Sequence, residues 1–196
     1  MRSLLAMLFV AGLLLTGCNE KVAPAPAFTN TDVTGLAYAQ DFSLKDFNGK
    51  LRTLADFKGK AVVVFFGYTQ CPDVCPTTMS DLAAAMKQLG PLADKVQVLF
   101  ITVDPERDTP QLLAKYVPGF DPRFLGLSGD AAATEKVAKD FKVFYQKVPG
   151  KEPGSYSMDH SAGLYIYDPQ GRIRLFARSG EGPDSLVHDL KILLSQ

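Results

Sequence analysis

The chain has 196 residues and carries 21 basic and 21 acidic side chains, so its formal net charge is zero. A balanced charge without a basic run argues against a nucleic-acid-binding protein, whose surface has to neutralise phosphates. Hydrophobic residues make up 46% of the chain, which is enough for one globular domain with a sizeable core. With only three cysteines and two histidines, each can be considered individually.

The first residues have the pattern of a bacterial export signal. Arg2 precedes an apolar run from Leu4 to Leu15, shorter than the roughly 20 residues that span a bilayer, and this fits the hydrophobic region of a secretory signal. The run ends in Leu15-Thr16-Gly17-Cys18, which resembles a bacterial lipobox; an ordinary signal with a chance cysteine is the alternative. We predict a lipoprotein signal peptide over residues 1–17 and lipidation of Cys18. The protein would then be anchored on the periplasmic side of a bacterial membrane.

The next segment is rich in proline, alanine and small polar residues. This composition predicts a flexible tether over residues 18–37 and a folded domain over residues 38–196. The domain opens with two short strands around Asn48-Gly49, a typical hairpin turn. A short turn over residues 54–57 follows.

The middle of the chain alternates between apolar runs and amphipathic patterns. The predicted order is strand 61–66, helix 76–89, strand 96–102, helix 110–116, strand 124–127 and helix 131–141. Residues 146–157 hold two prolines and two glycines and are interpreted as a mobile loop. A hairpin over residues 163–176 and a helix over residues 183–194 complete the chain. Alternating strands and helices predict a mainly parallel sheet with helices on its faces.

Cys71 and Cys75 lie between the buried strand 61–66 and the first long helix. In an open α/β sheet, ligands and chemistry usually lie at the carboxyl ends of the strands. Pro76 suits the first helical turn. Both cysteines are then expected just before the helix, near its positive dipole end, which favours the thiolate. Outside the cytoplasm such a pair can be a stable disulfide, a redox couple or part of a metal site.

Two histidines are available for imidazole chemistry. His160 precedes the strand 163–167, and folding can bring it to the cysteines; a surface loop histidine is the alternative. Asp159 either orients the imidazole or is a surface aspartate. His188 lies in the last helix and is interpreted as a partly exposed helix residue. Two thiolates and one imidazole would suit Cu(I) and tolerate Cu(II).

Three separated motifs resemble the Sco/SenC family of copper-binding proteins. They are Gly67-Tyr68-Thr69-Gln70-Cys71-Pro72-Asp73-Val74-Cys75-Pro76, Val103-Asp104-Pro105-Glu106-Arg107-Asp108-Thr109-Pro110 and Asp159-His160-Ser161. The resemblance covers about residues 42–194 and departs at Gln70, where many members carry histidine. The expected α/β fold is thioredoxin-like, with a central, mainly parallel mixed sheet flanked by helices and an N-terminal β-hairpin.

The resemblance implies a copper chaperone for the dinuclear CuA centre of cytochrome c oxidase. Its implied ligands for Cu(I) or Cu(II) are Cys71, Cys75 and His160. The implied partners are subunit II of the oxidase or another copper-receiving protein, and a periplasmic thiol reductant or copper donor. No nucleic acid is expected as a partner.

The main alternative is an extracytoplasmic thiol-disulfide oxidoreductase that uses Cys71 and Cys75 as a redox pair. Thioredoxin-type reductases usually place a proline directly before the strand that faces the cysteines. Here that place is occupied by Asp159-His160-Ser161-Ala162, which favours a metal site. A peroxiredoxin-like peroxidase is disfavoured because the residues before Cys71 lack the threonine and proline arrangement of that class.

Overall fold

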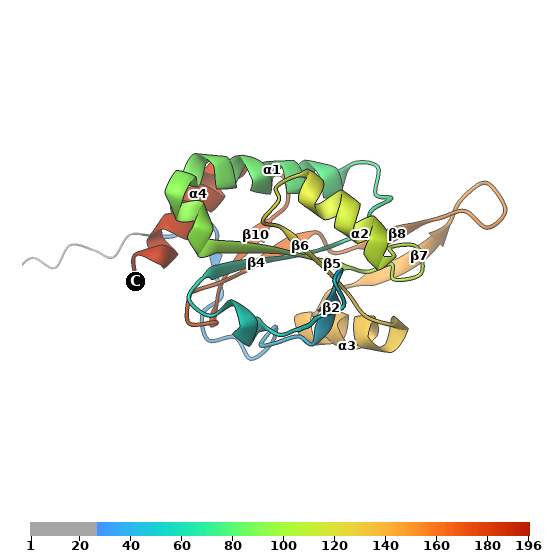
Figure 1. Cartoon of the computed structure of the whole chain (residues 1–196), viewed down its shortest axis with the longest axis horizontal. Helices are drawn as coiled ribbons and strands as arrows, with labels where there is room; N and C mark the ends of the chain where they lie inside the picture. Colours follow the sequence, from blue (N-terminus) through green and yellow to red (C-terminus); the bar gives the residue numbers. More distant parts are fainter. Residues whose placement is uncertain (1–26) are drawn as a thin grey trace, which may run out of the picture.

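A mixed eight-stranded β-sheet organises the part of the chain that the computed structural model describes, residues 27–196 (Figure 1). The strands are β1 Thr31–Asp32, β2 Leu44–Asp46, β3 Leu51–Arg52, β4 Ala61–Gly67, β5 Val96–Thr102, β6 Leu125–Ser128, β7 Tyr145–Pro149, β8 Tyr156–His160, β9 Gly163–Tyr167 and β10 Ile173–Arg178. The helices are α1 Val74–Leu89, α2 Pro110–Tyr116, α3 Ala131–Phe141 and α4 Pro183–Leu194. The predicted signal peptide 1–17 and Cys18 lie outside the described residues.

The order of strands in the sheet is β1-β10-β9-β4-β5-β6-β2-β3. Within the described residues, β4–β5 and β5–β6 are the parallel pairings, and the other neighbours run antiparallel. Helices α1, α2 and α4 cover one face and α3 covers the other (Figure 1). The expected thioredoxin-like α/β architecture with a central mixed sheet is confirmed. The sheet is not mainly parallel, contrary to the expectation, because β4–β5 and β5–β6 are its only parallel pairings among the described strands.

The centre of the sheet explains the apolar run that the sequence places there. Every residue of β4 is buried, as is nearly every residue of β5, because helices cover both of their faces. Phe66 packs edge to face against Phe141 of α3, with ring centroids 5.1 Å apart. This central core fixes the carboxyl end of β4, from which the cysteine loop departs.

Most predicted elements are confirmed, and their ends agree best where a helix cap or a turn sequence marks them. Thr109 caps α2 by accepting a hydrogen bond from the Leu112 N–H, and Asp130 caps α3 in the same way. The hairpin turn at Asn48-Gly49 joins β2 and β3. Helix α1 begins at Val74, two residues earlier than expected.

The interpretation of residues 146–157 as a mobile loop is wrong for both ends of that range, residues 146–149 and 156–157. Strands β7 and β8 pair antiparallel there and form a separate two-stranded sheet. The prolines and glycines that suggested a loop are concentrated around the turn, where the Gly150 N–H donates to the Ser155 carbonyl. The flanking residues do not alternate clearly between apolar and polar side chains, so their pattern does not predict a strand.

The segment before residue 38, expected to belong to the tether, already contacts the domain. Thr31 and Asp32 form β1, which pairs with β10. Just before it, the backbone N–H groups of Thr29 and Asn30 each donate to the buried carboxylate of Asp189 at 2.8 Å. The chain therefore enters the domain beside α4.

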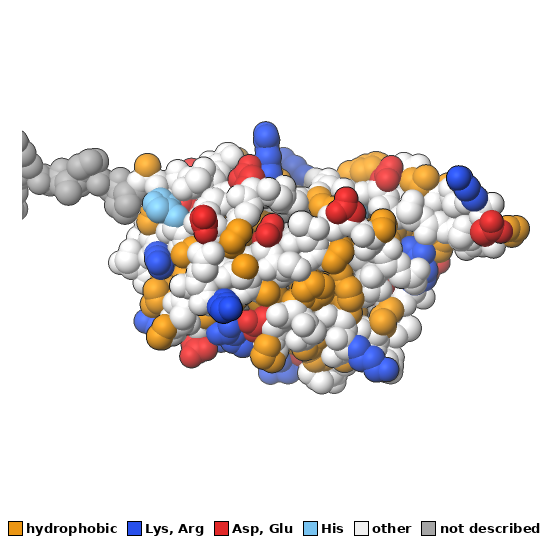
Figure 2. All heavy atoms as spheres, turned by 90° about the horizontal axis from the view of Figure 1, so that it is seen from above, with side chains coloured by type: hydrophobic (Ala, Val, Ile, Leu, Met, Phe, Trp, Pro, Cys, Tyr) orange, Lys and Arg blue, Asp and Glu red, His pale blue; other side chains and the backbone are white. Residues whose placement is uncertain are grey.

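The surface carries no large cluster of one charge on the face formed by α1, α2 and α4. Figure 2 shows acidic and basic side chains interspersed over that face. Among residues 27–196, no helix combines the length and the apolar character needed to cross a bilayer.

Candidate metal centre

Folding brings together the three side chains that the sequence analysis selected. The ligand atoms of Cys71, Cys75 and His160 all lie within 4.8 Å of one another. The Sγ of Cys75 lies 3.6 Å from Nε2 of His160, although the two residues are 85 positions apart in the sequence. Both cysteines are free thiols. The cluster lies where β4 ends, α1 begins and β8 ends.

A buried carboxylate holds the loop that leads to the cysteines. Asp108 accepts hydrogen bonds from the Thr69 N–H at 3.0 Å and from the hydroxyl groups of Thr69 and Thr102. Its side chain is buried, and this burial raises the pKa of the Asp108 carboxyl. The loop after β4 is thus tied to the end of β5, which explains why the motif around residues 103–110 accompanies the cysteine motif.

The two cysteines have different environments, contrary to the expectation that both precede the helix. Cys75 is the second residue of α1 and is fully buried, and this burial raises the pKa of its thiol. Its sulfur packs beneath Gly67, where an added Cβ would lie 3.0 Å from Sγ and 2.9 Å from the Phe100 ring. The role of Gly67 was missed, because the sequence does not reveal which side chain approaches its backbone.

Cys71 lies in the loop before α1 and is partly exposed. Its Sγ accepts a hydrogen bond from the Cys75 N–H in the first turn of the helix, at 3.4 Å. Any incoming thiol, disulfide or metal donor therefore meets Cys71 before it meets Cys75.

Hydrogen bonding orients the imidazole of His160 toward the cysteines. Its Nδ1 lies 3.0 Å from the Ser161 carbonyl, which can only accept, so Nδ1 carries the proton and Nε2 presents a lone pair to the cysteines. Burial lowers the pKa of His160, so the imidazole is neutral at pH 7. Tyr68 lies edge to face against the imidazole, with ring centroids 5.8 Å apart. The backbone of Ser161, rather than the exposed Asp159, fixes the tautomer.

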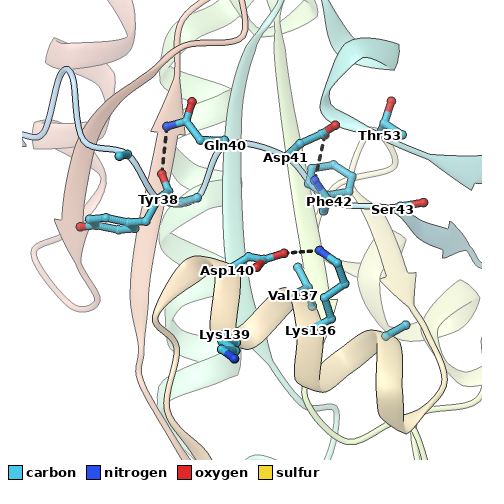
Figure 3. Close-up of a pocket in the computed structure, with 13 residues that line it drawn as sticks. Tyr38, Gln40, Asp41, Phe42, Ser43, Thr53, Lys136, Val137, Lys139 and Asp140 are labelled. Carbon is cyan, nitrogen blue, oxygen red and sulfur yellow. Dashed lines mark hydrogen bonds and ion pairs between the residues drawn. The ribbon is translucent and has the colours of Figure 1, made fainter.

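The remaining candidates do not belong to the cluster. His188 bonds to the neighbouring Asp189 at 2.8 Å on α4, and its side chain is 52% exposed, as expected for a helix residue. A cavity of about 600 Å³ lies elsewhere, between residues 37–43 and α3 (Figure 3). Figure 3 shows its Lys136 paired with Asp140, so these two charges satisfy each other.

The donor set fits copper. Thiolates are soft ligands that select Cu(I), and imidazole suits both oxidation states of copper. The Cys75 thiol has to lose its proton when a metal binds, and its Sγ lies 3.6 Å from Nε2 of His160. A partly exposed Cys71 above a buried Cys75 leaves one open side for exchange of a metal ion.

Comparisons with known proteins agree with this site. The sequence model of the SCO1/SenC family matches residues 31–195. The bovine "Protein SCO2 homolog, mitochondrial" is 45% identical over 133 residues, or 67% of this chain and 50% of the relative, so the chain spans about half the length of that relative. The "SCO2-like protein" of Rickettsia felis is 35% identical over 91% of this chain and 87% of its own length. The structure of Bradyrhizobium japonicum ScoI with copper bound has a TM-score of 0.71 and 45% identity, covering 77% of this chain and 96% of ScoI.

Proposed function

The chain belongs to the SCO1/SenC family, and on that premise we propose that it is a copper chaperone that holds copper through Cys71, Cys75 and His160. Its receiver is the CuA centre of cytochrome c oxidase, in subunit II, or another copper-receiving protein. The single observation that carries the proposal is the convergence of two sulfurs and one imidazole nitrogen within 4.8 Å of one another. A periplasmic copper donor or thiol reductant is the partner that loads or reduces the site.

The proposal is tested by metal analysis of the purified protein with its thiols reduced. We expect one copper ion per chain, and loss of that ion from a Cys71→Ser, Cys75→Ser double variant. In cells grown at limiting copper, the same double variant should fail to support assembly of the oxidase. Wild-type protein that retains no copper after reduction would contradict the proposal.

A second candidate function is reduction of disulfides in exported proteins, including the thiols of the copper receiver. The observation that favours it is the asymmetry of the pair, with Cys71 partly exposed in the loop before α1 and Cys75 buried in the first turn of that helix. Such an arrangement suits attack on a disulfide by the outer sulfur and release by the inner one. The two functions use the same cysteines and differ in their need for His160.

We also propose that Cys18 is lipidated after removal of residues 1–17, so that residues from Cys18 onwards tether the domain to the periplasmic side of a bacterial membrane. The lipobox-like sequence supports this proposal. Intact-mass measurement of the mature protein should show an acylated N-terminal cysteine. A Cys18→Ser variant should lose the acyl mass and leave the membrane fraction, and an unmodified terminus at another residue in the wild type would contradict the proposal.

A further inference from the structure

His160 is carried by a hairpin that does not pair with the main sheet. Strands β7 and β8 form their own two-stranded sheet, and Figure 1 shows this hairpin projecting beyond the rest of the domain. An isolated two-stranded hairpin is marginally stable in water. His160 is the last residue of β8 and pairs with Tyr145. Its position relative to the cysteines therefore depends on what holds the hairpin in place.

Arg107 holds the first residue of β8. Its Nη1 donates to the Tyr156 carbonyl at 2.8 Å, and its guanidinium lies over the Tyr156 ring, 3.6 Å from the centroid. The Tyr156 hydroxyl donates to Asp104 at 2.9 Å, and Arg107 Nε donates to the other oxygen of the same carboxylate. Backbone, ring and hydroxyl of Tyr156 are thus all fixed by the loop that follows β5.

The same guanidinium also contacts the cysteine loop. Nη1 donates to the side-chain oxygen of Gln70, the residue before Cys71, at 3.2 Å. The guanidinium carbon lies 5.7 Å from the ring centroid of Tyr68, which in turn packs against His160. Arg107 is therefore placed between the segment that supplies the sulfur ligands and the segment that supplies the imidazole.

The environment of Arg107 favours a positioning role over an ordinary surface ion pair. Its side chain is only 20% exposed, and the Asp104 carboxylate that it contacts is 1% exposed. Its Nη2 is buried without a hydrogen-bond partner in the described part of the chain, which carries a cost in stability. The planar guanidinium contacts three oxygen acceptors and an aromatic face at once, which lysine cannot reproduce.

We propose that Arg107 is a positioning residue of the copper site: it holds Tyr156 against the cysteine loop and thereby sets the position of His160. The inference rests on the proposed copper-binding function. Loss of Arg107 should lower the affinity for Cu(II) more than the affinity for Cu(I), because two thiolates alone can hold Cu(I) whereas Cu(II) favours additional nitrogen ligands.

The test compares Arg107→Met and Arg107→Lys with a matched control, Arg52→Met. Arg52 also bonds through Nε to a buried aspartate, Asp46, is 22% exposed and lies over an aromatic ring, but it is on β3 at the edge of the sheet. Arg107→Met should weaken Cu(II) binding about tenfold, which is the lower end of the range for losing a group that orients a metal ligand. The variant should also have an altered Cu(II) electron paramagnetic resonance spectrum. Cu(I) affinity should change by less than about threefold. Arg107→Lys should fall between wild type and Arg107→Met, and Arg52→Met should match wild type.

A double-mutant cycle separates positioning from general destabilisation. In a His160→Ala background, Arg107→Met should cause no further loss of Cu(II) affinity, because the residue that it positions is absent. An equal loss in both backgrounds, or unchanged Cu(II) binding in Arg107→Met, would overturn the inference.

A copper-free measurement keeps this inference distinct from the proposed function. In metal-free protein, amide hydrogen exchange of residues 156–160 should be faster in Arg107→Met than in wild type and unchanged in Arg52→Met. Unchanged exchange in Arg107→Met would overturn the positioning role. Wild-type protein that binds no copper would instead refute the proposed function and leave the exchange result to decide the role of Arg107.

Discussion

Protein oxidised to a Cys71–Cys75 disulfide is expected to bind Cu(I) at least about a thousandfold more weakly than the dithiol, a difference on the order of 4 kcal/mol. The disulfide consumes both sulfur ligands at once and leaves His160 alone. The two sulfurs lie within 4.8 Å of each other in the reduced protein, so a local shift of the loop before α1 can bring them to bonding distance. Redox state should therefore act as an on-off control of copper binding.

The measurement is an anaerobic Cu(I) titration of the oxidised and reduced forms against a chromophoric competitor ligand. A Cys18→Ser variant serves as the control, since it removes the third cysteine and leaves the site intact. It should retain the full difference between the two redox forms. Equal Cu(I) affinity of the oxidised and reduced proteins would show that the cysteines are not the copper ligands.

Replacing His160 by alanine should weaken Cu(II) binding by about ten- to hundredfold or more and affect Cu(I) much less. The change removes the one nitrogen donor and leaves the thiol pair in place, and two thiolates can still hold Cu(I) linearly. Oxidase assembly at limiting copper should fail in cells carrying this variant. His188→Ala is the matched control, because that histidine lies on α4 outside the cluster and its loss should leave copper binding unchanged.

The same variant separates the chaperone from the reductase. Electrons for disulfide reduction come from Cys71 and Cys75, so His160→Ala should still reduce a disulfide substrate, with a rate altered only through the environment of the Cys75 thiol. Copper binding and disulfide reduction are measured on the same preparations of wild type and variant. Unchanged binding of Cu(I) and of Cu(II) in His160→Ala would refute the three-ligand site and favour the reductase.

The sequence predicts best those elements that are defined by their own residues. Strand β5 and helix α4 have the bounds expected from their apolar patterns, and α2 begins at Thr109-Pro110 as the cap and the proline require. The two-residue strand β1 was missed because its stability comes from pairing with β10 and from Asp189, far along the chain. The hairpin β7–β8 was missed for the same reason: its anchoring contacts come from another segment.

The identities of the clustered residues could be predicted, but their environments could not. Motif spacing selected Cys71, Cys75 and His160, and the fold brings them together. The burial of Cys75 depends on its packing against Gly67 and Phe100, which no local pattern encodes. Likewise Arg107 appears in the sequence only as one residue of the motif 103–110, and the tertiary contacts are needed to show that it lies between the cysteine loop and the hairpin that carries His160.

The entry of the chain beside α4 has a consequence for how the protein meets its receiver. If lipid holds Cys18, residues 19–28 can reach at most about 35 Å before Thr29 and Asn30 bond to Asp189. The hairpin β7–β8 lies at the opposite end of the molecule from this entry point (Figure 1). A tether of that length would keep the domain within a thin layer above the bilayer, attached at the end that lies away from the hairpin. Delivery to a receiver in the same membrane would then be a two-dimensional encounter, governed by lateral diffusion and by the height of the receiving site above the lipid.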